Sequence, residues 1–317
     1  MNSTEPLISR RLTGKKHLSV TGALDLVNDA SFIFDLKNKQ ETGFLFDLSK
    51  VDETSMLGIL VIYKIIEYTS THKCFSDPLI NFDNPIIEAL HKYGFYDLIK
   101  TYLEQSEKIE KEYKNLQVSV KDNFIIAPQA LLRNSDFSER FLREEFLPRL
   151  QNYYKSNDKI ISMIFLSLSE IILNFWEHAV ADTKSILVAN GNKSRIEIAC
   201  ADTGNGIIST LRPFLKNLSG QEILNSAMKK GVTSKKETFH MGYGLWILDE
   251  LIRKTKGNLV IVTEGFIYSR FAEKTKTSVS GYWKGAIIYM SLPFQKPISL
   301  GELEDLKKFD HIKINWT

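Results

Sequence analysis

Glu170, Asn174 and His178 follow one another at intervals of four residues within residues 160–180. This stretch is almost continuously apolar and contains no glycine or proline, so the sequence predicts a long, largely buried helix. At this spacing a carboxylate, an amide and an imidazole project from a single stripe of the helix. Two further polar residues fall on the same side: Ser167 and Glu177. The stripe therefore gathers groups that can accept protons and bind polar ligands.

The simplest interpretation of this stripe is the solvated face of an amphipathic helix, and an isolated segment would favour it. Asn174 at the centre argues against that interpretation. Asparagine disfavours helix and brings no charge, so it is a poor choice for a surface position.

A second motif, Asp202-Thr-Gly204-Asn-Gly206, follows a segment of alternating character at residues 194–201. The alternation predicts a strand with Ile196, Ile198 and Cys200 on one face. A carboxylate after the strand can accept a hydrogen bond from the exocyclic amine of adenine, and glycines let the backbone approach a ligand closely. By itself, such a motif more often marks an ordinary turn.

A third motif contains Gly242 and Gly244 and opens a predicted helix over residues 245–254. The first amides of a helix have no partner within the helix, and the helix dipole favours anions there. The two glycines would let a phosphate reach these amides, although a glycine-containing loop before a helix is also an ordinary connection.

The first motif lies on a predicted helix, the second at the end of a strand and in the turn after it, and the third in a loop that opens a helix. Residues 120–295 resemble the ATP-binding domain of the GHKL family, shared by DNA gyrase, heat-shock chaperones, histidine kinases and MutL. The spacing Glu-x-x-x-Asn-x-x-x-His-Ala of the first motif is most similar to that of the anti-sigma-factor serine kinases. The resemblance implies an α+β chain whose ATP-binding domain is a Bergerat-type α/β sandwich.

The resemblance also assigns roles. Asn174 would coordinate Mg²⁺, Asp202 would hold the adenine of ATP, and Glu170 would be the general base. Mg²⁺ usually keeps waters and substrate phosphates, so one amide oxygen is a sufficient protein ligand. Phosphoryl transfer then needs mainly positioning and charge stabilisation. The remaining expected pocket residues are Gly204, Gly206, Gly242, Gly244 and Leu245. His178 would either support Glu170 and Asn174 or serve a structural role.

The stretch between the second and third motifs is rich in lysine, serine and threonine, and in the family it is a mobile lid over the phosphates. Candidate phosphate contacts in it are Lys229, Lys230, Lys235 and Lys236, next to Thr233 and Ser234. A charge run of this kind is otherwise a solvated loop. The predicted final strand, residues 285–293, carries Ala286 where the family commonly has threonine, which removes one polar contact near the adenine.

The first hundred residues predict a smaller α/β layer, with strands at 44–48 and 79–82 and helices at 56–68 and 85–93. Residues 12–100 resemble the STAS domain of anti-sigma-factor antagonists, in which a hydroxyl residue before a Gly-Leu-Gly turn is phosphorylated. Here the segment is shorter and Met56 replaces the first glycine. Thr54 or Ser55 is therefore expected to cap the following helix rather than to accept phosphate.

These patterns predict a STAS-like domain at residues 1–105, a linker at 106–120, the ATP-binding domain at 121–296 and a tail at 297–317. Residues 101–115 are rich in glutamate and lysine and predict a connecting helix or linker.

A chain of 317 residues with 43% hydrophobic content can build two packed domains. The two cysteines lack metal-ligand spacing, and no segment has the character of a signal peptide or membrane span, which favours the cytoplasm. The net charge of +3 is dispersed, so nucleic acid is not an expected partner. The expected partners are ATP and a regulatory protein, and a homodimer is compatible with the sequence.

Three functions remain open. The chain could be a serine/threonine kinase of a regulatory partner, an ATPase with a conformational cycle, or a nucleotide-dependent binding switch without turnover. Glu170 argues for catalysis, because a switch needs no base. None of the six histidines lies in a phosphoacceptor motif of the histidine-kinase type.

Overall fold

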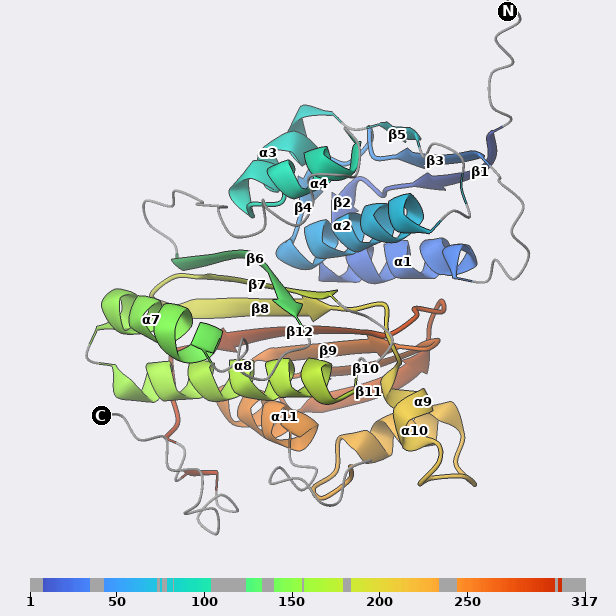
Figure 1. Cartoon of the computed structure of the whole chain (residues 1–317). Coiled ribbons are helices and arrows are strands. Elements are labelled where there is room, and N and C mark those ends of the chain that lie inside the picture. The colour runs from blue at the N-terminus through green and yellow to red at the C-terminus, as the bar shows by residue number, and fades with distance from the viewer. Residues whose placement is uncertain are drawn as a thin grey trace, which may run out of the picture.

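A seven-stranded sheet, a three-stranded sheet and a two-stranded pair, with helices between and around them, form the described part of this computed structural model (Figure 1). The structure describes residues 8–34, 43–72, 75, 79–81, 83–103, 124–132, 140–155, 157–178, 184–233, 244–299 and 302–303. Within them, helices and strands alternate irregularly along the chain, which makes the protein a mixed α+β structure. No helix in these ranges combines the length and the apolar character needed to cross a bilayer.

The larger sheet has seven strands in the order β11-β10-β9-β12-β8-β7-β6, and every neighbouring pair is antiparallel. Its strands are β6 (Phe124–Leu132), β7 (Lys184–Gly191), β8 (Arg195–Ala201), β9 (Asn258–Thr263), β10 (Phe266–Phe271), β11 (Lys274–Val279) and β12 (Ala286–Pro293). Strand β8 and strand β12 confirm the two strands predicted after residues 194 and 285.

One face of this sheet is covered by helices (Figure 1). The long helix α8 (Asp158–His178) and the helix α11 (Gly244–Thr255) confirm the two helices predicted around the first and third motifs. Ile196, Ile198 and Cys200 of β8 face this layer, as their alternation predicted. Three shorter helices complete the layer: α7 (Leu147–Tyr154), which continues from a π-helical turn (Phe141–Phe146), α9 (Ile207–Leu211) and α10 (Gly220–Ala227).

The N-terminal unit has a three-stranded parallel sheet of β1 (Ile8–Thr13), β3 (Gly43–Asp47) and β5 (Leu79–Asn81) in the order β1-β3-β5. A short pair, β2 (His17–Leu18) with β4 (Glu53–Thr54), lies beside it. Its helices are α1 (Val20–Ala30), α2 (Met56–Thr71), α3 (Asn84–Lys92) and α4 (Tyr96–Leu103), with a 3-10 turn at Ser31–Ile33. The strands predicted at 44–48 and 79–82 and the helices at 56–68 and 85–93 are confirmed, whereas α1 was not predicted.

The N-terminal unit packs on the second face of the seven-stranded sheet. Fourteen of the sixteen residues of α2 are buried, because α2 lies between the two sheets (Figure 1). Ala199 and Ala201 of β8 alternate with the helix-facing residues and share one hydrophobic core with α1, α2 and α4. The central strands of the seven-stranded sheet, such as β8, are therefore buried on both faces, and the N-terminal unit shares a core with them.

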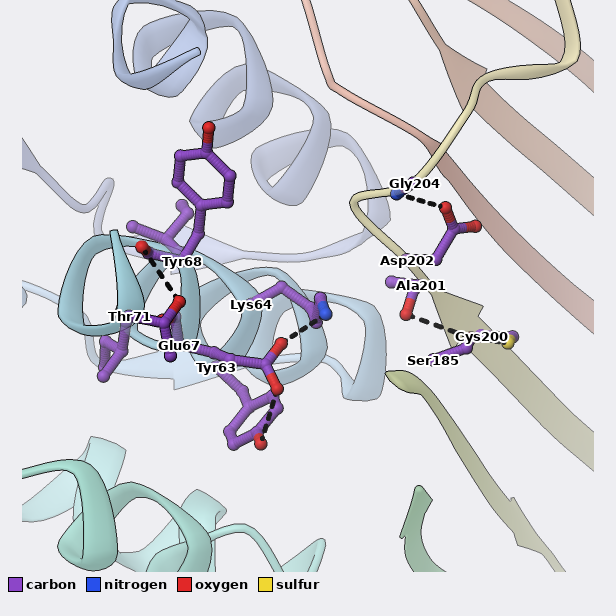
Figure 2. A network of polar contacts seen from close by, with 12 residues as sticks. Tyr63, Lys64, Glu67, Tyr68, Thr71, Ser185, Cys200, Ala201, Asp202 and Gly204 are labelled. Carbon is purple, nitrogen blue, oxygen red and sulfur yellow. Dashed lines mark hydrogen bonds and ion pairs between the residues drawn. The ribbon is translucent and has the colours of Figure 1, made fainter. Parts of the chain in front are cut away.

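A buried ion pair lies inside this interface. Lys64 is 1% exposed, and its ammonium contacts the Glu67 carboxylate, which also accepts a hydrogen bond of 3.3 Å from the Tyr63 hydroxyl. Figure 2 shows these side chains on α2 close to the end of β8, where Cys200, Ala201 and Asp202 lie.

Near the C-terminus, Ile298 and Leu303 are buried against the helix-covered core. The backbone carbonyl of Glu302 accepts a hydrogen bond of 2.7 Å from Lys254 at the end of α11. The first residues of the predicted tail thus pack on the domain. The predicted linker, 106–120, lies outside the described residues.

Candidate functional site

Helix α8 carries the first motif, and the described part of its polar stripe is buried or half-buried rather than solvated. Ser167 is fully buried and Glu170 is 5% exposed, whereas Asn174 is half-buried. The Asn174 amide nitrogen donates to the Glu170 backbone carbonyl at 2.8 Å. This bond within the helix fixes the plane of the amide. The side chains of Glu177 and His178 lie outside the described part of the chain.

Gly244, the first residue of α11, lies directly against this stripe. A Cβ atom at Gly244 would stand 2.7 Å from the Glu170 carboxylate and 3.1 Å from the Asn174 amide nitrogen. Only a glycine fits here without displacing a side chain. Residues of the first and third motifs, 70 positions apart in the sequence, are thus neighbours. Leu245 points into the core beneath α11, and Gly242 lies outside the described residues.

Helix α11 is anchored to the sheet by a buried ion pair. Asp249 accepts two hydrogen bonds from the Arg270 guanidinium of β10, at 2.6 and 2.7 Å, and one of 2.6 Å from the Tyr268 hydroxyl. Burial, together with the Asp249 carboxylate, raises the pKa of Tyr268 well above its usual value. The anchor holds the helix start, with Gly244, in position against α8.

Asp202 follows β8 and is 7% exposed. Its backbone amide extends the β8–β12 ladder by donating to the Ala286 carbonyl at 3.0 Å. Because side chains alternate along a strand, Asp202 shares the face of Cys200, which α8 and α11 cover. Its carboxylate accepts a hydrogen bond of 2.8 Å from the Gly204 amide (Figure 2). The carboxylate that sequence analysis selected therefore lies on the same face of the sheet as Glu170 and Asn174.

The glycine turn after Asp202 is packed closely against two neighbouring segments. Gly285 has a φ of 88°, a conformation that favours glycine, and a Cβ there would lie 2.6 Å from the Asp202 carbonyl oxygen. A Cβ at Gly206 would collide with the Glu264 side chain, which accepts a hydrogen bond of 2.8 Å from the Ser209 amide. A side chain at Gly206 or Gly285 would therefore collide with a neighbouring segment.

Thr263, at the end of β9, connects the turn after Asp202 with the turn at Gly285. Sequence analysis did not identify this residue. Its buried hydroxyl accepts from the Ile207 amide at 3.1 Å and donates to the Gly285 carbonyl at 2.8 Å. Thr263 is also the cross-strand partner of Ala286, the position where the sequence lacks a threonine. A threonine at the end of a strand is common, so no sequence signal distinguishes it.

The described start of the predicted lid lies near α11. Lys229 and Lys230 are exposed, and the Lys230 ammonium stands 5.5 Å from the centre of the Trp246 ring in the first turn of α11. Lys230 is thus close to the helix N-terminus that would attract an anion. Ser234, Lys235 and Lys236 lie outside the described residues.

The described polar groups around Gly244 are a buried carboxylate, Glu170, and a half-buried amide, Asn174, at the start of a helix. Within the described ranges, no three histidine, cysteine, aspartate or glutamate side chains gather as metal ligands. Comparison with protein-family models gives no match to this chain, and comparison with curated proteins gives none either.

Proposed function

We propose that this protein binds Mg²⁺-ATP and transfers its γ-phosphoryl group to a hydroxyl acceptor, with Glu170 as the general base. The observation that carries the proposal is the contact of Gly244 with Glu170 and Asn174, because a base and an amide then lie at the start of a helix. Helix starts bind phosphate through their free amides. In this proposal the domain is a GHKL-type Bergerat sandwich and the N-terminal unit is STAS-like.

Each side chain has a distinct task in the proposed reaction. Asp202 accepts a hydrogen bond from the adenine amine, and the Glu170 carboxylate takes the proton from the attacking hydroxyl as the oxygen bonds to the γ-phosphorus. The bond to the β–γ bridging oxygen breaks, and ADP leaves. Asn174 would offer its amide oxygen to Mg²⁺, a ligand type this ion prefers. When bound, Mg²⁺ neutralises charge on the phosphate oxygens.

The N-terminal unit is proposed to act as a built-in regulatory partner rather than as the substrate. The Ser55 hydroxyl caps α2 by accepting a hydrogen bond of 3.1 Å from the Gly58 amide. The helix it caps is buried between two sheets. Phosphate on Ser55 would disturb this cap. Mass spectrometry after incubation with ATP is expected to find no phosphate on Thr54 or Ser55, and stoichiometric phosphate there would contradict this role.

The catalytic assignment is tested by Mg²⁺-dependent ATP binding and phosphate release with the Glu170→Gln variant. Ser169→Ala, one residue earlier on the same helix, is the matched control. We expect Glu170→Gln to bind ATP but to lose about a hundredfold or more of turnover, the size of a general-base contribution. Unchanged turnover would remove Glu170 from the mechanism. Binding by the wild type without turnover, also in the presence of candidate protein acceptors, would favour a nucleotide-dependent switch.

A further inference from the structure

Trp283 lies on the short connection between β11 and β12 and is fully buried. Its indole nitrogen donates a hydrogen bond of 3.0 Å to the backbone carbonyl of Asp202. The Trp283 carbonyl accepts one of 3.0 Å from the Glu264 amide, beside the glycine turns. The side chain and the backbone of Trp283 thus both contact segments that shape the candidate site.

The indole ring of Trp283 also contacts the N-terminal unit. Phe34 packs edge-on against Trp283 with ring centres 5.1 Å apart, and Phe34 in turn contacts Tyr68 of α2 with centres 4.8 Å apart. The rings of Tyr68, Phe34 and Trp283 are thus in continuous contact, from α2 to the hydrogen bond with Asp202.

The backbone before Trp283 is also fixed to the N-terminal unit. The Gly281 amide donates to the Asn28 side chain at 2.5 Å, and the Tyr282 amide donates to the Ser31 hydroxyl at 2.8 Å. A Cβ at Gly281 would lie 2.5 Å from the Asn28 Cα atom, so the two backbones are in direct contact. The position of this connection is therefore set by α1 and the turn after it.

Asp202 is held on both sides by the same connection. Trp283 bonds its carbonyl, Ala286 bonds its amide, and Gly285 lies so close that a Cβ there would stand 2.4 Å from the Asp202 carboxylate. A shift of residues 281–286 must move the Asp202 backbone, and the carboxylate moves with it.

We propose that Trp283 is a positioning residue for Asp202, through which the N-terminal unit sets how tightly the site binds the adenine amine. This inference rests on the proposed function, because it takes Asp202 as the adenine acceptor. It adds a residue that the three sequence motifs do not contain, and it gives the fused N-terminal unit a direct effect on nucleotide recognition.

The test compares two nucleotides by equilibrium titration of the full chain: ATP, and purine riboside triphosphate, which lacks the exocyclic amine. Trp283→Phe keeps an aromatic ring but removes the hydrogen-bond donor. We expect it to weaken ATP binding about two- to tenfold, the range of one hydrogen bond, and to leave the affinity for the analogue unchanged. In an Asp202→Asn background the same change is expected to have no further effect on ATP binding.

A second variant keeps the test informative if Trp283→Phe is poorly folded. Asn28→Ala removes an exposed side chain that contacts the connection, and the exposed neighbour Asp29→Ala is its control. We expect Asn28→Ala to weaken ATP binding selectively and Asp29→Ala to leave it unchanged.

The positioning role would be overturned if the variants bound ATP and the analogue more weakly by the same factor. It would also be overturned if both Trp283→Phe and Asn28→Ala bound each nucleotide as tightly as the wild type does. Failure of the wild type to bind ATP would instead refute the proposed function. The positioning role can also fail by itself. This is the case if the wild type prefers ATP over the analogue and Asp202→Asn abolishes that preference, but Trp283→Phe and Asn28→Ala both keep it.

Discussion

At the scale of single residues, the site depends on the absence of a side chain at Gly244. Glu170 and Asn174 fill the space that a Cβ would occupy, so these two side chains and the start of α11 meet without a gap. Because the nearest atoms are the ends of side chains rather than backbone, an added methyl group would displace the Glu170 carboxylate before it disturbed the fold.

We therefore predict that Gly244→Ala separates activity from stability. Displacement of a reacting group by about 1 Å can lower a rate about a hundredfold, so phosphate release is expected to fall about ten- to a hundredfold. The free energy of unfolding should change by less than about 1 kcal/mol, since alanine favours helix. Lys254→Ala, in the last turn of the same helix, is the control and should keep full activity. A fully active Gly244→Ala would contradict the proposed closeness of Glu170 to the reacting atoms.

Asp47, in the N-terminal unit, gives a prediction about pH. Its carboxylate accepts hydrogen bonds from the Ser49 hydroxyl at 2.7 Å and the Ser49 amide at 3.1 Å, and it pairs with Arg11. The Ser49 hydroxyl bond, followed by the Arg11 and Ser49 amide bonds, lowers the pKa of Asp47 to about 2.

A carboxylate with a lowered pKa stabilises the fold above its unfolded pKa, near 3.8, and loses this effect as the pH falls towards 2. Arg11 is largely exposed, so we expect a contribution on the order of 1 kcal/mol. Urea unfolding of the wild type and of Asp47→Asn should show a difference in unfolding free energy that is constant above about pH 5 and shrinks below pH 4. A difference that does not vary with pH would show that the Asp47 charge has no part in it.

At the scale of elements, the sequence predicts the helices and strands that carry the motifs because their patterns are strong. The apolar stretch without breakers gives α8, and the alternation before Asp202 gives β8. Gly285 and the apolar run after it mark β12, and Gly244 marks α11. The contact between α8 and α11 has no local signal, since it arises from packing of two distant segments on one sheet.

The elements that the sequence did not predict have weaker patterns. Helix α1 contains a glycine and two aspartates, and the hairpin β10–β11 is largely polar on its exposed edge strand. The contacts of Thr263 and Trp283 join segments that are far apart in the sequence, so residue type and spacing do not reveal them.

The cap of α2 gives a prediction at this scale. Ser55 has extended backbone geometry and its hydroxyl accepts a hydrogen bond from Gly58, whereas the Thr54 hydroxyl donates to the Ser55 carbonyl at 3.2 Å. We expect Ser55→Ala to lower the free energy of unfolding by about 1 kcal/mol, the usual cost of losing an N-cap. Thr54→Ala, measured in parallel by chemical denaturation, should cost less. The reverse order would show that Ser55 does not cap α2.

At the scale of the whole molecule, the N-terminal unit and the seven-stranded sheet share a core. Helix α2 is apolar on nearly all sides, and such a helix must be buried all round. The sequence contains this signal, but it does not say which second surface covers the helix. In the structure that surface includes Ala199, Ala201 and Val262, on the face of the sheet opposite the candidate site.

The shared core predicts one cooperative unfolding transition. Glu67→Ala removes the carboxylate from the buried Lys64 and is expected to cost about 3–5 kcal/mol, because it leaves the ammonium without that partner. Calorimetry should show a single transition in the wild type that moves as a whole to lower temperature in Glu67→Ala. Glu88→Ala, at an exposed position on α3, is the control and should leave the transition in place. Two transitions, of which only one moves, would contradict a common core.

Calorimetric titration with Mg²⁺-ATP is the measurement that decides whether Asn174 and its neighbours form an ATP site, as we propose. We expect saturable binding of one nucleotide by the wild type and an affinity at least about tenfold lower in Asn174→Ala, since a ligand to the cation is lost. No binding by the wild type, or the same affinity in Asn174→Ala, would contradict this proposal.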